Sequence, residues 1–274
     1  MNPPVIPYRA TWLVMLAFMA LTAVSGCATL PDGKRWGEDA SFRVGWHRVA
    51  DAALQAAKSP AVWAPLAAAA VMQIDNWDHD VSRWAVDNTP IFGSDTNAHD
   101  ASNTLEVAAG SLYLASVLAA PGGDAGSDRW SAKLKGFTVG LGAIAAESIT
   151  VEGLKVATTR ERPNGGVDSF PSGHTAFAAV ADTLAVQNFA VTPMSGATRM
   201  ALTIGADALT FATGWARVEA GAHYPSDVLV GMSIGNFFGR MFDDAFLGDG
   251  LSQRLAVSFE PARGGAELVW SWRF

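Results

Sequence analysis

From about residue 48 to residue 245, the apolar residues follow a helical pattern in which alanine is frequent. Breaks containing proline or glycine interrupt this pattern, and each marks the end of one helix and the start of another. They lie at Pro60, 88–90, 121–123, 163–166 and Pro193. We therefore predict helices at residues 48–58, 60–74, 78–86, 99–119, 128–160, 173–190, 196–215 and 225–245.

The segments on either side of this helical region carry an alternating pattern. Phe42, Val44 and Trp46 alternate with other residues, which predicts a short strand. Two alternating runs near the C-terminus, at 255–259 and 268–274, flank a Pro-Ala-Arg-Gly-Gly turn. We predict an all-α helical bundle with a small C-terminal β-hairpin. The hairpin either packs on the bundle as a small sheet or serves as a surface-docking ribbon.

The first 26 residues have the organisation of an export signal. They carry one charged side chain, Arg9, and then an apolar run that ends in small residues. Cys27, the single cysteine of the chain, follows Val-Ser-Gly and resembles the acylated lipobox cysteine of bacterial lipoproteins. An ordinary signal peptide or a short transmembrane anchor is the alternative. The resemblance implies an anchor in the membrane of a bacterial cell envelope, since several acyl chains hold a protein stably. The same resemblance implies that Ala28 after the cysteine, in place of Asp, favours the outer membrane, facing the periplasm.

These patterns divide the chain into four parts. They are a lipoprotein signal peptide at 1–26, a lipid-anchored tether at 27–47, a helical domain at 48–248 and a β-hairpin tail at 249–274. A membrane-spanning helix needs about 20 mostly apolar residues. The uncharged stretches within the helical domain are shorter or interrupted. We therefore expect a water-soluble helical body that its lipid holds at the membrane, with a polytopic membrane enzyme as the alternative.

Composition and charge narrow the class of partner. Half of the residues are hydrophobic and 16% are charged, which is ample apolar material for a core. The net charge is −7, so a nucleic-acid partner, which needs a basic face, is not expected. The acidic stretch 75–80 is either a metal cluster or the polar start of a helix. No other ligand-spaced group supports a metal, so none is predicted.

Three short segments carry the candidate chemistry, and the last of them contains His223 and Asp227. These two residues are four apart, and Pro225 between them predicts a helix that begins there. Asp227, in the first turn, can then reach one nitrogen of the His223 ring and leave the other free as a nucleophile. Arg217, at the end of the preceding helix, can point into the same pocket.

The middle segment is Pro171-Ser172-Gly173-His174, directly before an apolar helical run. Backbone N–H groups at such a helix N-terminus are free donors for an oxyanion. Gly173 permits close approach of the backbone, and His174 at the same rim is placed for general-acid catalysis.

The first segment places Lys155 and Arg162 seven residues apart, or about two helical turns. Both are predicted to face one side of a helix that Pro163 ends. Arginine offers a rigid fork for two phosphate oxygens and lysine a point charge. Arg160 falls on a different face and is predicted to lie outside the pocket. His99, for which the sequence offers no partner, is predicted to lie at the surface or at a helix end.

In this order and spacing, the segments match the pattern K-x(6)-R-P, P-S-G-H and S-R-x(5)-H-x(3)-D, apart from Ala216 in the serine position. The chain thereby resembles the type 2 phosphatidic acid phosphatase and vanadium haloperoxidase superfamily over roughly residues 155–227. The resemblance implies a metal-independent phosphatase without a cofactor. In that mechanism His223 attacks phosphorus and forms a phosphohistidine, Asp227 orients it, and His174 protonates the leaving oxygen. The groups that hold the non-bridging oxygens are Lys155, Arg162, Ser172, Gly173 and Arg217.

The substrates implied are phosphate monoesters. An acyl-anchored enzyme favours lipid or isoprenyl phosphates, with small soluble esters as the alternative. A haloperoxidase that uses vanadate is a second possibility. However, the seven residues between Pro163 and Pro171 leave little material for a lid, which favours the phosphatase. A non-catalytic lipoprotein that binds a partner or an anion is the third, and Ala216 is its only support.

Overall fold

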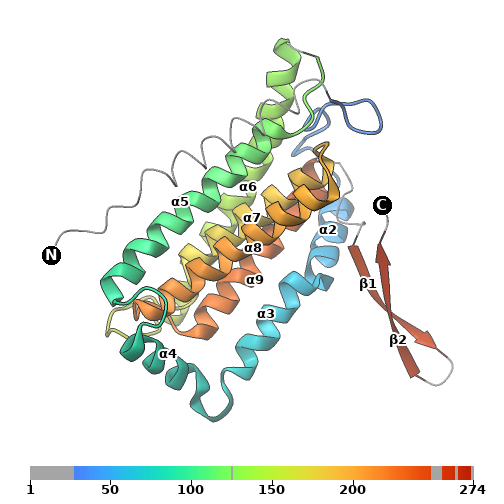
Figure 1. Cartoon of the computed structure of the whole chain (residues 1–274). Helices are drawn as coiled ribbons and strands as arrows, with labels where there is room; N and C mark the ends of the chain where they lie inside the picture. Colours follow the sequence, from blue (N-terminus) through green and yellow to red (C-terminus); the bar gives the residue numbers. More distant parts are fainter. Residues whose placement is uncertain (1–27, 125, 248–254, 263–264, 273–274) are drawn as a thin grey trace.

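The computed structural model describes residues 28–124 and 126–247 in full and the backbone alone of 255–262 and 265–272 (Figure 1). The first two ranges consist mainly of helices. These are α2 (Trp46–Lys58), α3 (Pro60–Val71), the 3-10 helix η1 (Ile74–Asn76), α4 (Trp77–Asn88), α5 (Asp95–Ala119), α6 (Ser127–Thr158), α7 (Gly173–Val191), α8 (Gly196–Glu219), α9 (Pro225–Phe242) and the π-helical turn η2 (Asp243–Leu247).

The predicted all-α fold is confirmed, and every predicted helix is present with ends shifted by up to about four residues. Capping explains the largest shift at a start. The Ser94 hydroxyl accepts a hydrogen bond from the backbone N–H of Asn97 at 3.1 Å, so α5 begins at Asp95. At the end of α6, Thr159 adopts a left-handed conformation with φ of 45°, which stops the helix before the predicted residue 160.

The short strand predicted at residues 42–46 is wrong, because Trp46 begins α2 and the residues before it form no strand. Contacts with the end of the bundle hold this segment instead. The backbone N–H of Ser41 donates to the carbonyl of Phe246 at 2.9 Å. The Phe42 ring packs against the Phe246 ring with centroids 5.1 Å apart.

At the C-terminus, the backbone forms two strands, β1 (Leu255–Ala262) and β2 (Gly265–Trp272), which pair antiparallel. The residues of the expected turn, 263–264, and the side chains of both strands are outside the described residues. The predicted hairpin and its role therefore stay predictions. The predicted signal peptide and the lipidation site at Cys27 also lie outside the described residues.

Helix α7 is the centre of the bundle and packs against α5, α6, α8 and α9 (Figure 1). Glycines on α9 allow its closest contact. A Cβ atom on Gly235 would lie 2.2 Å from the backbone oxygen of Ala176, and one on Gly231 would lie 2.5 Å from that of Ser172. Helices α7 and α9 therefore touch backbone to backbone, and their N-terminal ends are brought together.

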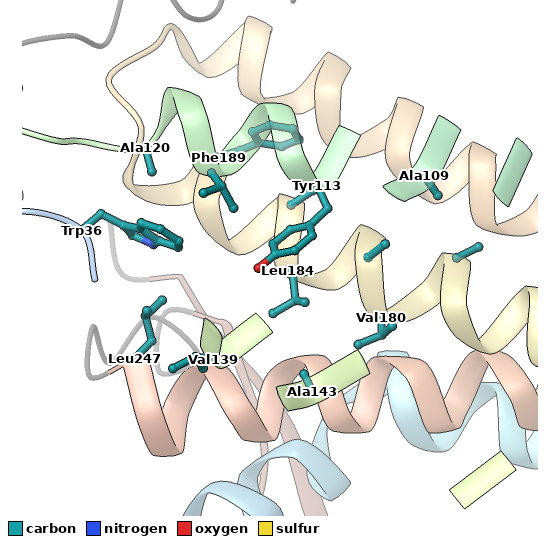
Figure 2. Close-up of a cluster of buried hydrophobic side chains, with 14 residues drawn as sticks. Trp36, Ala109, Tyr113, Ala120, Val139, Ala143, Val180, Leu184, Phe189 and Leu247 are labelled. Atoms are coloured by element: carbon teal, nitrogen blue, oxygen red, sulfur yellow. The ribbon is translucent and has the colours of Figure 1, made fainter. Parts of the chain in front are cut away.

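A hydrophobic cluster fills the bundle around Tyr113, Leu184 and Phe189 (Figure 2). Trp36, which is 1% exposed, completes this cluster from the segment before α2. Gly136 on α6 makes room for the indole, because a Cβ atom there would lie 2.6 Å from the Trp36 ring. The stretch that the sequence indicates as a tether therefore contributes a core side chain.

Among the described helices, α6 is long and apolar enough to cross a membrane, judged by length and composition alone. Only 28% of its most apolar window is buried inside the protein. Whether α6 lies in a membrane or on the surface of a water-soluble body therefore stays a prediction.

Candidate active site

The site lies at one end of the bundle, where α7 and α9 begin and where α6 and α8 end (Figure 1). The loop 159–172 joins α6 to α7 across this end. The backbone N–H of Ser172 donates to the backbone carbonyl of Asp227 at 3.0 Å. This bond ties the start of α7 to the first turn of α9, so the segments that carry His174 and His223 are fixed relative to each other.

His223 lies just outside α9 and is 2% exposed. Its Nδ1 is 2.6 Å from the backbone carbonyl oxygen of Ser169 and 3.9 Å from Oδ2 of Asp227. A carbonyl only accepts, so Nδ1 carries the proton and Nε2 presents a lone pair. The predicted direct contact from Asp227 to the ring is replaced by a contact through the Ser169 backbone.

Burial lowers the pKa of His223 well below its ordinary value, and the positive charges of Arg217 and Arg162 lower it further. The hydrogen bond to Ser169 opposes this shift. His223 is therefore a neutral imidazole at physiological pH, with a fixed tautomer. These are the properties of a nitrogen nucleophile.

Asp227 is fully buried, and three groups hold its carboxylate. The Ser169 hydroxyl donates to Oδ2 at 2.6 Å, and the backbone N–H of Tyr224 donates to the same oxygen at 2.9 Å. A guanidinium nitrogen of Arg160 is 2.5 Å from Oδ1. Burial raises the pKa of Asp227, while Ser169 and Arg160 oppose the rise. Asp227 thus holds the Ser169 segment, whose carbonyl in turn holds His223.

Arg160 supports the site from behind Asp227. It lies in the loop after α6, not on a helix face, and it bridges Asp227 to Asp78 of α4. Its guanidinium carbon is 4.3 Å from the centroid of the Tyr224 ring, a cation–π distance. Asp78, 2% exposed, also accepts from the Ser226 backbone N–H at 2.8 Å and from the Ser226 hydroxyl at 2.5 Å.

Asp78, from the acidic stretch 75–80, therefore supports the site through Arg160 and Ser226. Of the two interpretations, the polar start of a helix is the better one, because Asp78 lies in the first turn of α4. Within the described residues, no group of three His, Cys, Asp or Glu side chains could hold a metal ion.

Lys155 and Arg162 reach the site from different elements, the first from a helix and the second from a loop. Lys155 lies in the last turn of α6, and a methyl group on Gly173 would be 3.5 Å from its Nζ. Arg162 lies in the loop, where its backbone N–H donates to Gly166 at 2.7 Å. The expectation of two helical turns between these cations is wrong, since α6 ends at Thr158.

Arg217 lies in the last turn of α8 and is 3% exposed. A terminal nitrogen of its guanidinium is 3.2 Å from both His99 Nδ1 and Ser102 Oγ of α5. Burial and the charge of Arg162 lower the pKa of Arg217 to about 10, so it stays cationic at neutral pH. Within the described part of the chain, the buried Nε atoms of Arg162 and Arg217 have no hydrogen-bond partner. Both are donors that an oxyanion would satisfy.

His174 lies in the first turn of α7 and faces α5. Its Nε2 is 2.9 Å from Oδ1 of Asn103 and 3.4 Å from Oε2 of Glu106. Burial lowers the pKa of His174 to about 4, and the positive charges of Arg217, Lys155 and Arg162 add to this effect.

Ser172 and Gly173 form the N-terminal boundary of α7, as the sequence predicts. Ser172 is fully buried, and its hydroxyl pairs with that of Thr175 at 3.0 Å. Ala216, where the pattern has serine, is also fully buried. A methyl group there contributes packing but no hydrogen-bond donor.

The three predicted segments therefore converge. The charges of Arg217, Arg162 and His174 all act on the pKa of His223, and those of Arg217, Lys155 and Arg162 act on that of His174. The sequence did not predict the contacts that Asn103 and Glu106 of α5 make with His174. It placed Arg160 on a helix, and it assigned Asp78 only to the start of a helix. Nothing in the order or spacing of the α5 residues links them to the three segments.

At one end of an all-helical bundle, two imidazoles at the starts of two helices meet cations from the ends of two others and from a loop, and such an arrangement suits an oxyanion. The model of the PAP2 superfamily matches residues 137–243 of the chain. No curated protein matches the chain. A solved structure similar to the chain is a transmembrane PAP2-type phosphatidylglycerolphosphate phosphatase from Bacillus subtilis. It shows 20% sequence identity and a TM-score of 0.48, over 72% of this chain and 94% of that one.

Proposed function

We propose that the protein is a metal-independent phosphatase that hydrolyses phosphate monoesters through a phosphohistidine on His223. The observation that carries the proposal is the state of His223. It is buried and neutral, its Nδ1 proton is committed to Ser169, and the positive charges of Arg217 and Arg162 act on it. A dianionic phosphoryl group in this place would bind to the cations and meet the Nε2 lone pair.

In the first step, Nε2 of His223 attacks phosphorus, and the bond from phosphorus to the ester oxygen breaks. The leaving oxygen takes a proton from the imidazolium of His174. Lys155, Arg162 and Arg217 hold the non-bridging oxygens with the backbone N–H of Gly173. Phosphoryl transfer depends mostly on positioning and charge stabilisation, so fixed cations can take the place of metal ions.

In the second step, a water molecule attacks the phosphohistidine and gives its proton to the now neutral His174. The bond from phosphorus to nitrogen breaks, and its electron pair returns to Nε2 of His223. Inorganic phosphate is released, and both histidines regain their starting protonation. Asp227 and Ser169 keep the His223 ring in one tautomer throughout.

We propose lipid or isoprenyl phosphates as the substrates, presented by the membrane to which an acylated Cys27 would attach the enzyme. Exposed apolar side chains support an association with lipid. Trp130, Leu134, Ile149 and Val156 on α6 are between 60% and 77% exposed. Such a row is costly in water and favourable against lipid. The outer membrane, facing the periplasm, is the proposed location.

A phosphate-release assay tests the activity. Protein without residues 1–27 should release phosphate in EDTA from at least one ester in a panel of lipid, isoprenyl and soluble phosphates. His223→Ala should abolish this release without changing the circular dichroism spectrum. His47→Ala, an exposed histidine on α2, is the matched control and should be fully active. Release that survives His223→Ala would contradict the proposal.

Vanadate separates the phosphatase from the haloperoxidase. The phosphatase should only be inhibited by vanadate, whereas a haloperoxidase would gain bromide oxidation. A non-catalytic binding protein would show neither activity.

Cell fractionation tests the attachment. The full chain should partition with membranes, and Cys27→Ser should release it or block its maturation. Unchanged membrane partition of mature Cys27→Ser would contradict the lipid anchor.

A further inference from the structure

A carboxylate lies beside the histidine that the proposed mechanism uses as its acid. Oε2 of Glu106 is 3.4 Å from Nε2 of His174, and Oδ1 of Asn103 is 2.9 Å from the same nitrogen. Asn103 and Glu106 are three residues apart on α5, so they lie on one helix face. The side chains of Glu106 and His174 are each 30% exposed, so their interaction is partly shielded from water.

The other charged groups that act on His174 are cationic or can become so. Arg217 comes from α8, Lys155 from α6, Arg162 from the loop after α6 and His99 from α5. Each disfavours a positive charge on the His174 ring. A general acid must nevertheless carry a proton when the ester bond breaks. Glu106 is within ion-pair distance of the ring and supplies the opposite charge.

A second carboxylate, Glu147, is close enough for the charge of Glu106 to act on it. Glu147 on α6 is 1% exposed, and burial raises its pKa to about 7, with the charge of Glu106 adding to the rise. Burial also raises the pKa of Glu106, but Arg217 opposes that rise. The charge of Arg217 thus favours the ionised form of Glu106.

We propose that Glu106 is a positioning residue that stabilises the protonated form of His174 from which the leaving group takes its proton, while Asn103 orients the ring. Both act on Nε2, so the proton delivered to the leaving oxygen comes from Nδ1. The proposal rests on the proposed phosphatase activity and assigns to α5 a role that the sequence motifs do not contain.

Leaving-group dependence tests this role. Dinitrophenyl phosphate has a stable leaving group that needs no proton, whereas phenyl phosphate needs one. Glu106→Gln should lower kcat for phenyl phosphate by about tenfold to a hundredfold, part of the roughly 10²–10⁴-fold that a general acid supplies. With dinitrophenyl phosphate it should change kcat by less than about threefold, because the acid is not required. Asp100→Asn, an exposed acid on the same helix, should leave both activities unchanged.

The two substrates also separate this proposal from its premise. If the wild-type protein hydrolyses neither ester, the proposed function fails. If the wild type is active and Glu106→Gln slows both esters equally or slows neither, the role of Glu106 is wrong.

A double-mutant cycle distinguishes an effect of Glu106 through His174 from a general defect in folding. In a His174→Ala background, Glu106→Gln should cause no further loss with phenyl phosphate, because the group on which Glu106 acts is gone. A further loss equal to that in the wild-type background would overturn the proposal.

Discussion

Arg160 connects the site to the rest of the chain at the scale of single residues. Its guanidinium contacts Asp227 on one side and Asp78 on the other, and its flat face lies on Tyr224. Asp78 in turn holds the backbone and side chain of Ser226, next to Asp227. The position of the His223 ring therefore depends on an acid of α4 that never touches it.

Asp78→Asn should weaken both stability and activity. It removes one charge from a buried ion pair and leaves Arg160 with a single acidic partner. We expect the free energy of unfolding to fall by about 1–3 kcal/mol and kcat/KM to fall by about tenfold, roughly 1.4 kcal/mol. Urea unfolding and the phosphate-release assay measure the two effects.

Asp80→Asn is the matched control for this change. Asp80 lies in the same first turn of α4, but its ion pair with Arg83 is exposed. Its loss should cost less than about 1 kcal/mol and leave the activity unchanged. Equal stability and equal activity in the two variants would show that the bridge through Asp78 contributes nothing.

The sequence predicts the motif residues but not their partners. His174, His223, Lys155 and the arginines that flank them are recognisable because fixed spacing within short segments survives in the linear pattern. Asp78 lies 148 positions from Ser226, so no local pattern joins them. The partner of His223 is a backbone carbonyl, which every residue has and no sequence motif marks.

At the scale of elements, the contact between α7 and α9 sets the geometry of the site. Gly231, Gly235 and Gly239 recur every four residues along one face of α9. A Cβ atom at any of them would meet α7 atoms at 2.2–2.8 Å. This contact holds the N-terminal ends of both helices at the distance that the site requires.

Gly235→Ala should therefore destabilise the bundle. The added methyl group would lie 2.2 Å from a backbone oxygen of α7, so one helix must move. Overpacking of this kind costs about 1–3 kcal/mol, and the shift should also lower the activity. Urea unfolding measures the change in the free energy of unfolding.

Gly205→Ala on α8 is the control, because a Cβ atom there meets nothing within 4 Å. It should stabilise the protein by up to about 1 kcal/mol, the difference in helix propensity between alanine and glycine. Equal stabilisation by both substitutions would mean that α7 and α9 are not in close contact.

The elements themselves are largely predictable, because proline and glycine separate helices of clear periodicity. Pro225 predicts the start of α9 correctly, since proline fits the first helical position. The end of α6 is not predictable from Pro163, because Thr159 leaves the helix four residues earlier. The alternation at 42–46 is misleading. Phe42 is apolar because its ring packs against Phe246, and the segment does not form a strand.

At the scale of the whole molecule, the polar site and the hydrophobic cluster around Trp36 involve different parts of the same helices. Helix α7 contributes His174 at its start and Phe189 near its end. The buried apolar side chains of the cluster lie together between the helices (Figure 2), and their burial stabilises the bundle. The start of the helix carries free N–H groups for an anion. Because the polar site and the hydrophobic cluster lie at different ends of the helices, several cations can lie close together without being placed in the hydrophobic core.

The central claim, a phosphohistidine on His223, is tested most directly by detecting this covalent intermediate. It can form only if the bundle brings Lys155, His174 and His223 together. The protein is mixed with dinitrophenyl phosphate, quenched in base within milliseconds and digested for mass spectrometry. One phosphoryl group should appear on His223, should be lost in acid and should be absent from His223→Ala. Phosphate release without any adduct on His223, or an adduct on another residue, would contradict the account.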